Sequence, residues 1–140
     1  MKQAYIAGNW KMNMTPSEGA AFVKELVKAI AGTDSKVMVA PPFVTIPAVL
    51  EAARGSALIV AAQNMSNHEG GAYTGEVSPL MLKDLGVNDV ILGHSERRSI
   101  YGECDEVINE KVLLALKHDM NVVFCIGETL DERESGRLEE

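Results

Sequence analysis

The segment Val90-Ile91-Leu92-Gly93-His94-Ser95-Glu96-Arg97-Arg98 joins an apolar run directly to a histidine and a group of charged residues. The apolar run predicts a buried strand, and Ser95 predicts the start of a helix. A second polar cluster, Asn9-Trp10-Lys11-Met12-Asn13, follows the apolar run at 4–7 in the same way. Because the carboxyl ends of parallel strands share one edge of a sheet, we expect an amide, a cation and an imidazole to meet there.

Short apolar runs, spaced by roughly one βαβ unit of about 30 residues, predict five buried parallel strands. These runs lie at 4–7, 37–40, 58–62, 90–92 and 122–126. Helix start signals fall between and after them, at Thr15-Pro16-Ser17-Glu18, Thr45-Ile46-Pro47, Ser78-Pro79, Ser95 and Thr129. No linker or low-complexity tract interrupts this alternation, so residues 1–140 are expected to form a single α/β domain.

Two of the predicted helices carry apolar residues at helical spacing, which indicates one buried face on each. In the helix that starts after Thr15, the residues expected to face inward are Phe22, Val23, Leu26, Val27 and Ile30. The helix that begins at Ser95 resumes after Gly102, and its longer part places inward Val107, Ile108, Val112, Ala115 and Leu116.

Composition narrows the classes of partner. The chain has 140 residues, is 46% hydrophobic and carries a formal charge of −7, with Lys and Arg scattered along it. A nucleic-acid partner is therefore not expected, because it would require a basic stripe. An anion must then be recognised locally, by one Lys, one Arg or one helix N-terminus.

The chain contains no apolar run of the roughly 18 residues that a membrane helix needs, so no membrane partner is expected. Asn9 and Lys11 interrupt the only stretch that resembles a leader. Cys104 and Cys125 have no CxxC spacing, which fits a reducing compartment. We therefore expect a cytoplasmic protein.

Regular β/α alternation fits both a closed barrel and an open doubly wound sheet. The chain has neither GxGxxG after the first strand nor GxxxxGK[ST], so the sequence favours the barrel. The spacing of His68, His94 and His118 matches no metal motif, and a catalytic metal is not expected.

The three polar candidates each allow a functional and a structural interpretation. A helix that starts at Ser95 would disfavour the imidazolium form of His94, and a neutral ring can donate a hydrogen bond; alternatively, His94 only caps a strand end. Lys11 has the charge to balance a phosphate dianion, or it is a solvated surface lysine. Asn9 supplies an amide donor, or it satisfies the loop backbone.

Among the carboxylates, Glu96 is the candidate for a general base. It lies in the first helical turn near Arg97, Arg98 and Lys11, so its pKa is expected to fall and its role is to orient a cation. The other carboxylates that follow loops or strand ends are interpreted as loop or capping groups: Glu76, Glu103 and Glu128.

Two further features remain open. Cys125 lies near the end of a predicted strand, where an apolar surrounding favours packing over a role as nucleophile. The polar loop at 64–77 contains Gly70, Gly71 and Gly75, and predicts either a flexible lid or a contact with a partner.

Five ordered segments of the chain resemble the triosephosphate isomerase family. They are AGNWKMN at 7–13, AAQN at 61–64, GAYTGEVS at 71–78, LGHSERR at 92–98 and FCIGETLDERESG at 124–136. The resemblance implies the TIM (β/α)8 barrel fold, of which 140 residues would supply about five βα units as an incomplete barrel. It also implies the cofactor-free interconversion of dihydroxyacetone phosphate and glyceraldehyde 3-phosphate through an enediolate, in glycolysis and gluconeogenesis.

The same resemblance assigns roles to individual residues. Asn9 and Lys11 match the substrate-binding pair, and His94 matches the neutral electrophile of triosephosphate isomerase itself. Asn9, Lys11, His94 and Glu96 are thus the catalytic candidates. Supporting positions are Ser95 and Cys125, and the dimer contact is made by Thr74, Gly75 and Glu76 of the 64–77 loop. A homodimer and a small phosphorylated triose substrate are therefore expected.

In that family the catalytic glutamate, the closing loop and the glycine-rich phosphate loops follow the fifth strand. Residues 1–140 contain none of them, so the chain corresponds to the N-terminal half and is expected to have negligible isomerase activity alone. Five strands would also leave two sheet edges unpaired and the inner face uncovered. The alternative is a noncatalytic half-barrel that serves folding, oligomerisation or complementation.

Overall fold

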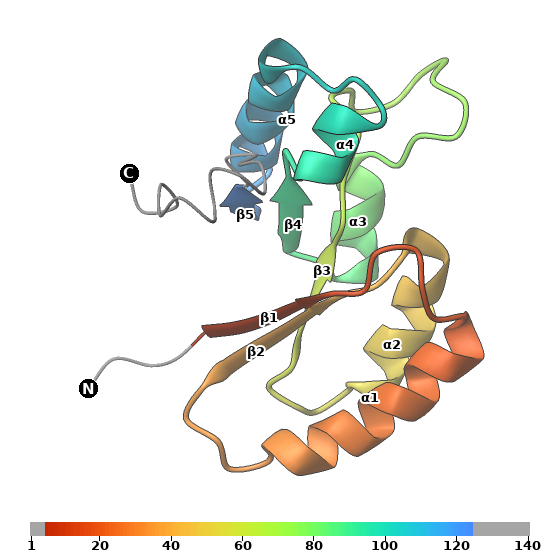
Figure 1. Cartoon of the computed structure of the whole chain (residues 1–140), viewed down its shortest axis with the longest axis vertical. Coiled ribbons are helices and arrows are strands. Elements are labelled where there is room, and N and C mark those ends of the chain that lie inside the picture. The colour runs from red at the N-terminus through yellow and green to blue at the C-terminus, as the bar shows by residue number, and fades with distance from the viewer. Residues whose placement is uncertain (1–4, 125–140) are drawn as a thin grey trace.

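A computed structural model describes residues 5–124 of the chain. Its sheet has five strands, β1 (Tyr5–Asn9), β2 (Lys36–Ala40), β3 (Ile59–Ala62), β4 (Asp89–Leu92) and β5 (Asn121–Phe124). Neighbouring strands pair in parallel and in chain order, from β1 to β5 (Figure 1). A doubly wound sheet reverses its strand order partway, whereas a barrel does not. The structure is a curled half-barrel, which confirms the expected part of a TIM barrel.

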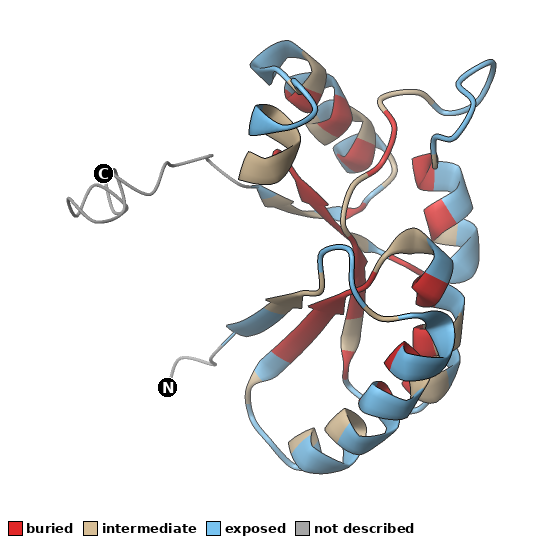
Figure 2. Ribbon diagram, turned by 45° about the vertical axis from the view of Figure 1, so that its right-hand side comes forward, coloured by how far each residue is buried: buried red, intermediate tan, exposed pale blue. Residues whose placement is uncertain are grey.

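The helices connect successive strands and cover one face of the sheet (Figures 1 and 2). They are α1 (Pro16–Ile30), the 3₁₀ turn η1 (Phe43–Thr45), α2 (Ile46–Ala52), α3 (Pro79–Leu85), α4 (Ser95–Ser99) and α5 (Asp105–Lys117). The main core lies between these helices and the outer face of the sheet. In β2, for example, Val37 and Val39 join this core, whereas Met38 and Ala40 join a smaller apolar cluster on the inner face.

Local hydrogen bonds explain where α1 begins, but α2 begins without a side-chain cap. The capping box predicted at Thr15 is present, because the Glu18 amide donates to Thr15 Oγ1 and the Thr15 amide donates to Glu18 Oε1. The hydrogen bond from the Thr15 backbone lowers the pKa of Glu18 below its usual value. Thr45 precedes α2 but does not cap it, since its hydroxyl donates instead to the Met14 carbonyl at 2.8 Å.

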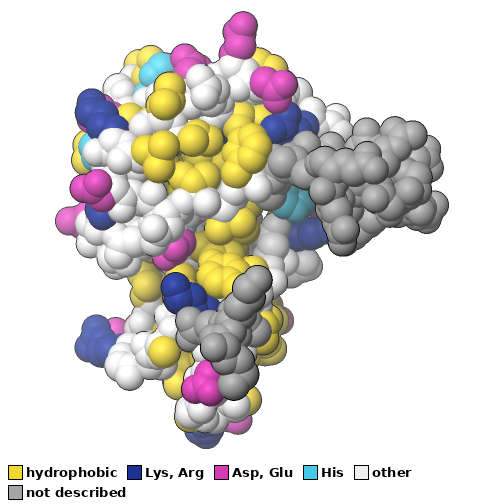
Figure 3. All heavy atoms as spheres, turned by 90° about the vertical axis from the view of Figure 1, so that its left-hand side faces the viewer, with side chains coloured by type: hydrophobic (Ala, Val, Ile, Leu, Met, Phe, Trp, Pro, Cys, Tyr) yellow, Lys and Arg dark blue, Asp and Glu magenta, His cyan; other side chains and the backbone are white. Residues whose placement is uncertain are grey.

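The prediction that all five strands are buried is wrong at the two edges of the sheet. Ile6 in β1 is 55% exposed and Phe124 in β5 is 52% exposed, whereas β2, β3 and β4 are mostly buried. Apolar side chains gather on the side of the molecule that carries these edges (Figure 3). An edge strand has a neighbour on one side only, so its side chains lack half of the packing that a central strand receives.

The inward face of α5 also differs from the prediction. Ile108 and Ala115 are buried as expected, but Leu116 is 56% exposed and Lys111 is only 4% exposed. The buried face therefore follows positions 108, 111 and 115, which lie above one another on a helix. Within residues 5–124, every helix is too short or too polar to cross a lipid bilayer.

Gly19 allows α1 to approach η1 closely, and this gives a first prediction. A Cβ at this position would lie 2.7 Å from Thr45 Cγ2 and 3.0 Å from the Trp10 ring. The overpacking in Gly19→Ala costs about 1–3 kcal/mol, which outweighs the helix-propensity gain of about 0.5–1 kcal/mol. We expect urea denaturation to report a lower free energy of unfolding.

Gly70→Ala is the control for this measurement, because no atom lies within 4 Å of the Cβ that it adds. Its free energy of unfolding should stay within about 0.5 kcal/mol of the unsubstituted protein. Equal effects of the two substitutions would contradict a tight contact between α1 and η1.

Candidate active site

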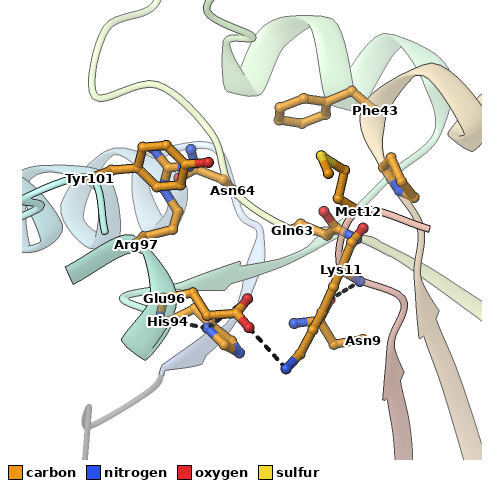
Figure 4. A pocket seen from close by; sticks show the side chains of 11 residues that line it. Asn9, Lys11, Met12, Phe43, Gln63, Asn64, His94, Glu96, Arg97 and Tyr101 are labelled. Atoms are coloured by element: carbon orange, nitrogen blue, oxygen red, sulfur yellow. Dashed lines mark hydrogen bonds and ion pairs between the residues drawn. The ribbon is translucent and has the colours of Figure 1, made fainter. Parts of the chain in front are cut away.

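Polar residues gather at the carboxyl ends of β1, β3 and β4, as the sequence predicted for the first and last of these strands (Figure 4). They surround an open pocket of about 310 Å³. It is lined by Asn9, Lys11, Met12, Pro42, Phe43, Gln63, Asn64, His94, Glu96, Arg97 and Tyr101. The structure therefore brings together Asn9, Lys11, His94 and Glu96, the four residues predicted to be catalytic.

Lys11 has a backbone conformation that is rare for residues other than glycine, with φ at 56°. Its amide donates to Asn9 Oδ1 at 2.9 Å, so the Asn9 oxygen orders the turn after β1. Its ammonium lies 2.9 Å from Glu96 Oε2 at the start of α4. Lys11 is therefore solvent-accessible over half of its side chain, as the alternative of a solvated surface lysine predicts, but its ammonium is paired with Glu96 at the pocket.

The hydrogen bond at His94 assigns different roles to its two ring nitrogens. His94 Nδ1 accepts a hydrogen bond from the Glu96 amide at 3.1 Å. With Nδ1 as the acceptor, Nε2 is the nitrogen that can donate to a ligand. His94 therefore caps α4 with one nitrogen and keeps the other as a donor.

Glu96 is held in its ionised form. Its hydrogen bond with Lys11 is the largest effect and lowers its pKa; burial raises the pKa, the charge of Lys11 lowers it again, and the net pKa is below the usual value. The predicted direction is confirmed, but the cause is Lys11 rather than the two arginines. Arg97 contacts Glu103, and Arg98 contacts the Gly93 carbonyl. A carboxylate with a lowered pKa is a poor base and a good partner for a cation.

A buried charged cluster supports the α4 side of the pocket. Lys111 Nζ donates to Glu103 Oε2 at 2.6 Å and to Asn64 Oδ1 at 2.9 Å. Arg97 Nε donates to the same Glu103 oxygen at 3.1 Å. Burial raises the pKa of Glu103, but the hydrogen bonds and charges of Lys111 and Arg97 outweigh it, and the net pKa is lowered. The charges are thus paired where water is largely excluded.

Sequence patterns missed this cluster and part of the pocket. The sequence pattern predicts a loop carboxylate at Glu103 and no role for Lys111, because a local pattern does not reveal which distant partner a charged side chain meets. Gln63 and Asn64 had a usable signal, since they directly follow the apolar run at 58–62 just as Asn9 follows the run at 4–7.

The 64–77 loop projects away from the sheet (Figure 1). It is closed at its base by a hydrogen bond from the Ser66 amide to the Val77 carbonyl, at 2.8 Å. Its first part is tied to α5, where Lys117 Nζ donates to Glu69 Oε1 at 2.8 Å. Thr74, Gly75 and Glu76 are exposed, and none of them lines the pocket.

Several predictions concern residues that the structure does not describe. The supporting residue Cys125, the carboxylate Glu128 and the helix start at Thr129 lie outside the described residues. The other supporting residue, Ser95, opens α4 beside His94. Residues 5–124 contain no group of three or more His, Cys, Asp or Glu side chains arranged to hold a metal ion.

Parallel strands in chain order, with polar side chains at their carboxyl ends, are typical of the TIM-barrel fold. The family model described as triosephosphate isomerase matches residues 4–140. The chain belongs to the triosephosphate isomerase family, which confirms the resemblance.

Three curated relatives named triosephosphate isomerase illustrate the similarity. The chain is 53% identical over 139 residues to the protein of Carboxydothermus hydrogenoformans, covering 97% of this chain and 55% of that protein. It is 49% identical over 137 residues to that of Thermoanaerobacter pseudethanolicus, covering 98% and 55%. It is 50% identical over 139 residues to that of Treponema denticola, covering 99% and 56%. The chain thus spans about half the length of these relatives.

The buried cluster gives a second prediction. Glu103→Gln should lower the free energy of unfolding by about 3 kcal/mol, because it leaves the buried Lys111 charge without its partner. Glu103→Gln combined with Lys111→Met should lose less than the sum of the two single losses. A double-mutant cycle by urea denaturation measures this coupling. Strict additivity would contradict a coupled pair.

The lowered pKa of Glu103 sets the pH dependence of the stability that Glu103→Gln loses. The carboxylate contributes its full stability above its unfolded-state pKa of about 4.3, and the contribution disappears as pH falls through the lower folded-state pKa. The difference in stability between the unsubstituted protein and Glu103→Gln should therefore narrow as the solution is acidified below about pH 4. Denaturation curves at several pH values provide the test.

Proposed function

We propose that this chain supplies the electrophilic and cation-bearing part of a triosephosphate isomerase site. The reaction is the interconversion of dihydroxyacetone phosphate and glyceraldehyde 3-phosphate through an enediolate, without a cofactor. The observation that carries the proposal is the His94 ring, whose Nδ1 is occupied by the Glu96 amide while Nε2 remains a donor, with the Lys11 ammonium nearby. A neutral donor beside a fixed cation suits an oxygen on which negative charge develops.

In this mechanism each residue has a distinct task. His94 Nε2–H donates to the substrate oxygen as the enediolate forms, and the Lys11 ammonium balances the phosphate dianion and the developing charge. Glu96 holds that ammonium in position at 2.9 Å. The Asn9 oxygen is engaged by the Lys11 amide, which leaves the Asn9 amide nitrogen to donate to substrate. Ser95 supports the position of His94 at the start of α4.

Proton removal from carbon needs a base, and Glu96 is unsuited to this task because its pKa is lowered. The family resemblance assigns the base to a glutamate after the fifth strand. A polypeptide restricted to these 140 residues is therefore expected to show negligible isomerase activity, since general acid–base groups typically contribute about 10²–10⁴-fold.

The proposal extends to assembly and cellular role. The exposed tip of the 64–77 loop, with Thr74, Gly75 and Glu76, is proposed to contact a second copy of the protein and so form a homodimer. The resemblance that supports this contact also supports a role in cytoplasmic glycolysis and gluconeogenesis.

A second candidate function is a noncatalytic half-barrel that pairs with a complementing polypeptide. The uncovered apolar side chains of Ile6 and Phe124 at the two sheet edges favour it. A coupled isomerase assay of the natural gene product separates the two candidates, because only the first requires turnover that depends on His94.

The isomerase proposal predicts the effect of two substitutions in the natural gene product. His94→Gln should lower kcat at least about 100-fold, because the proton donor to the substrate oxygen is lost. Lys11→Met should raise KM for glyceraldehyde 3-phosphate and lower kcat, since it removes the charge that faces the phosphate. Steady-state kinetics in the coupled assay measure both effects.

Lys28→Met is the matched control, because Lys28 is exposed on α1 and its ion pair within residues 5–124 is with the neighbouring Glu25. It removes a cation without touching the pocket, so kcat and KM should not change. Full activity in either His94→Gln or Lys11→Met would refute the proposed function.

A further inference from the structure

The unusual backbone of Lys11 needs support from its surroundings. A φ of 56° lies in the left-handed region, which disfavours a residue with a Cβ. Such a conformation persists only when neighbouring groups hold it in place. The peptide unit before Lys11 is held by Asn9 Oδ1, which accepts from the Lys11 amide at 2.9 Å.

The peptide unit after Lys11 is held from another strand, by Gln63. Gln63 Nε2 donates to the Lys11 carbonyl at 2.8 Å and to the Ala40 carbonyl at 2.8 Å. Ala40 ends β2, and Gln63 directly follows β3. One amide nitrogen thus uses both of its hydrogens to join the turn after β1 to the end of β2.

Ala40 connects to the same turn a second time. Its carbonyl also accepts from the Trp10 amide at 3.1 Å. The peptide units on both sides of the Lys11 Cα are therefore fixed, and the side chain leaves the backbone in one direction. That direction brings the ammonium across the pocket to Glu96 at 2.9 Å (Figure 4).

We propose that Gln63 is a positioning residue for Lys11, acting through the Lys11 carbonyl rather than on the reacting atoms. The inference rests on the proposed function, because it assigns Gln63 a part in placing the cation that meets the phosphate. The amide is the suitable group at this position, since it offers two hydrogens to two carbonyl oxygens. A carboxylate offers none, and Asn is shorter by one methylene group.

The test compares two substitutions in the natural gene product. Gln63→Met keeps the length of the side chain but removes both donated hydrogen bonds. Thr45→Val is the matched control, because it removes the hydrogen bond from the Thr45 hydroxyl to the Met14 carbonyl, which also holds the segment between β1 and α1. Both lose a side-chain bond to a distant carbonyl, but only Gln63→Met releases Lys11.

Three quantities are measured for each variant: kcat and KM for glyceraldehyde 3-phosphate, the inhibition constant of inorganic phosphate, and Tm. Gln63→Met should lower kcat by about tenfold and raise KM and the phosphate inhibition constant by at least about fivefold, because misplacement of a binding group is costly. Thr45→Val should lower Tm and change the kinetic constants less than about twofold.

A lowered Tm in Gln63→Met with unchanged kcat, KM and phosphate inhibition would overturn the inference, since Gln63 would then only stabilise the fold. If Gln63→Met does not yield folded protein, Gln63→Asn is measured in the same way and is expected to show the same kinetic losses. Normal kinetics in Gln63→Asn would equally overturn the inference. Lys11→Met distinguishes failure of the proposed function from failure of the inference about Gln63. If Lys11→Met keeps full activity, the proposed function is wrong. If Lys11→Met loses activity while Gln63→Met has normal kinetics, only the positioning role of Gln63 is wrong.

Discussion

Parallel pairing of the strands in chain order is the constraint on which the site depends. Because every strand points the same way, the turns that follow β1, β3 and β4 emerge at one edge of the sheet. Lys11 and Glu96 are far apart in the sequence, yet they meet at 2.9 Å across this edge. The register also brings Gln63 beside the Lys11 carbonyl. A pocket lined by a lysine ammonium thus arises in a chain whose formal charge of −7 gives no general attraction for anions.

Charge in this half-barrel is balanced locally, by pairs rather than by an overall field. Glu96 is ionised because Lys11 faces it, and Glu103 is ionised because Lys111 and Arg97 outweigh the effect of burial. The first pair is open to solvent, so the Lys11 ammonium is accessible from the pocket while Glu96 holds it. The second pair is buried, so breaking it is costly and it supports the wall of the pocket instead.

The two edge strands of the sheet expose apolar side chains that a closed barrel would cover. Ile6 and Phe124 are exposed at opposite ends, whereas the three central strands are covered by helices on their outer face. In a closed barrel each strand has two neighbours, and no edge remains. The same exposed side chains therefore fit the proposed isomerase, as part of a closed barrel, and the second candidate, as a surface for a complementing polypeptide.

The sequence by itself determined the order of strands and helices, the capping box at Thr15 and the polar residues at strand ends, because spacing and capping are encoded by near neighbours. It predicted that Asn9, Lys11, His94 and Glu96 would meet. Only the tertiary structure decided why Lys111 is buried while Leu116 is exposed, and that Gln63 holds Lys11. Each of these depends on a contact between residues that are distant in the chain or on the position of a strand within the sheet, and neither is contained in a local pattern.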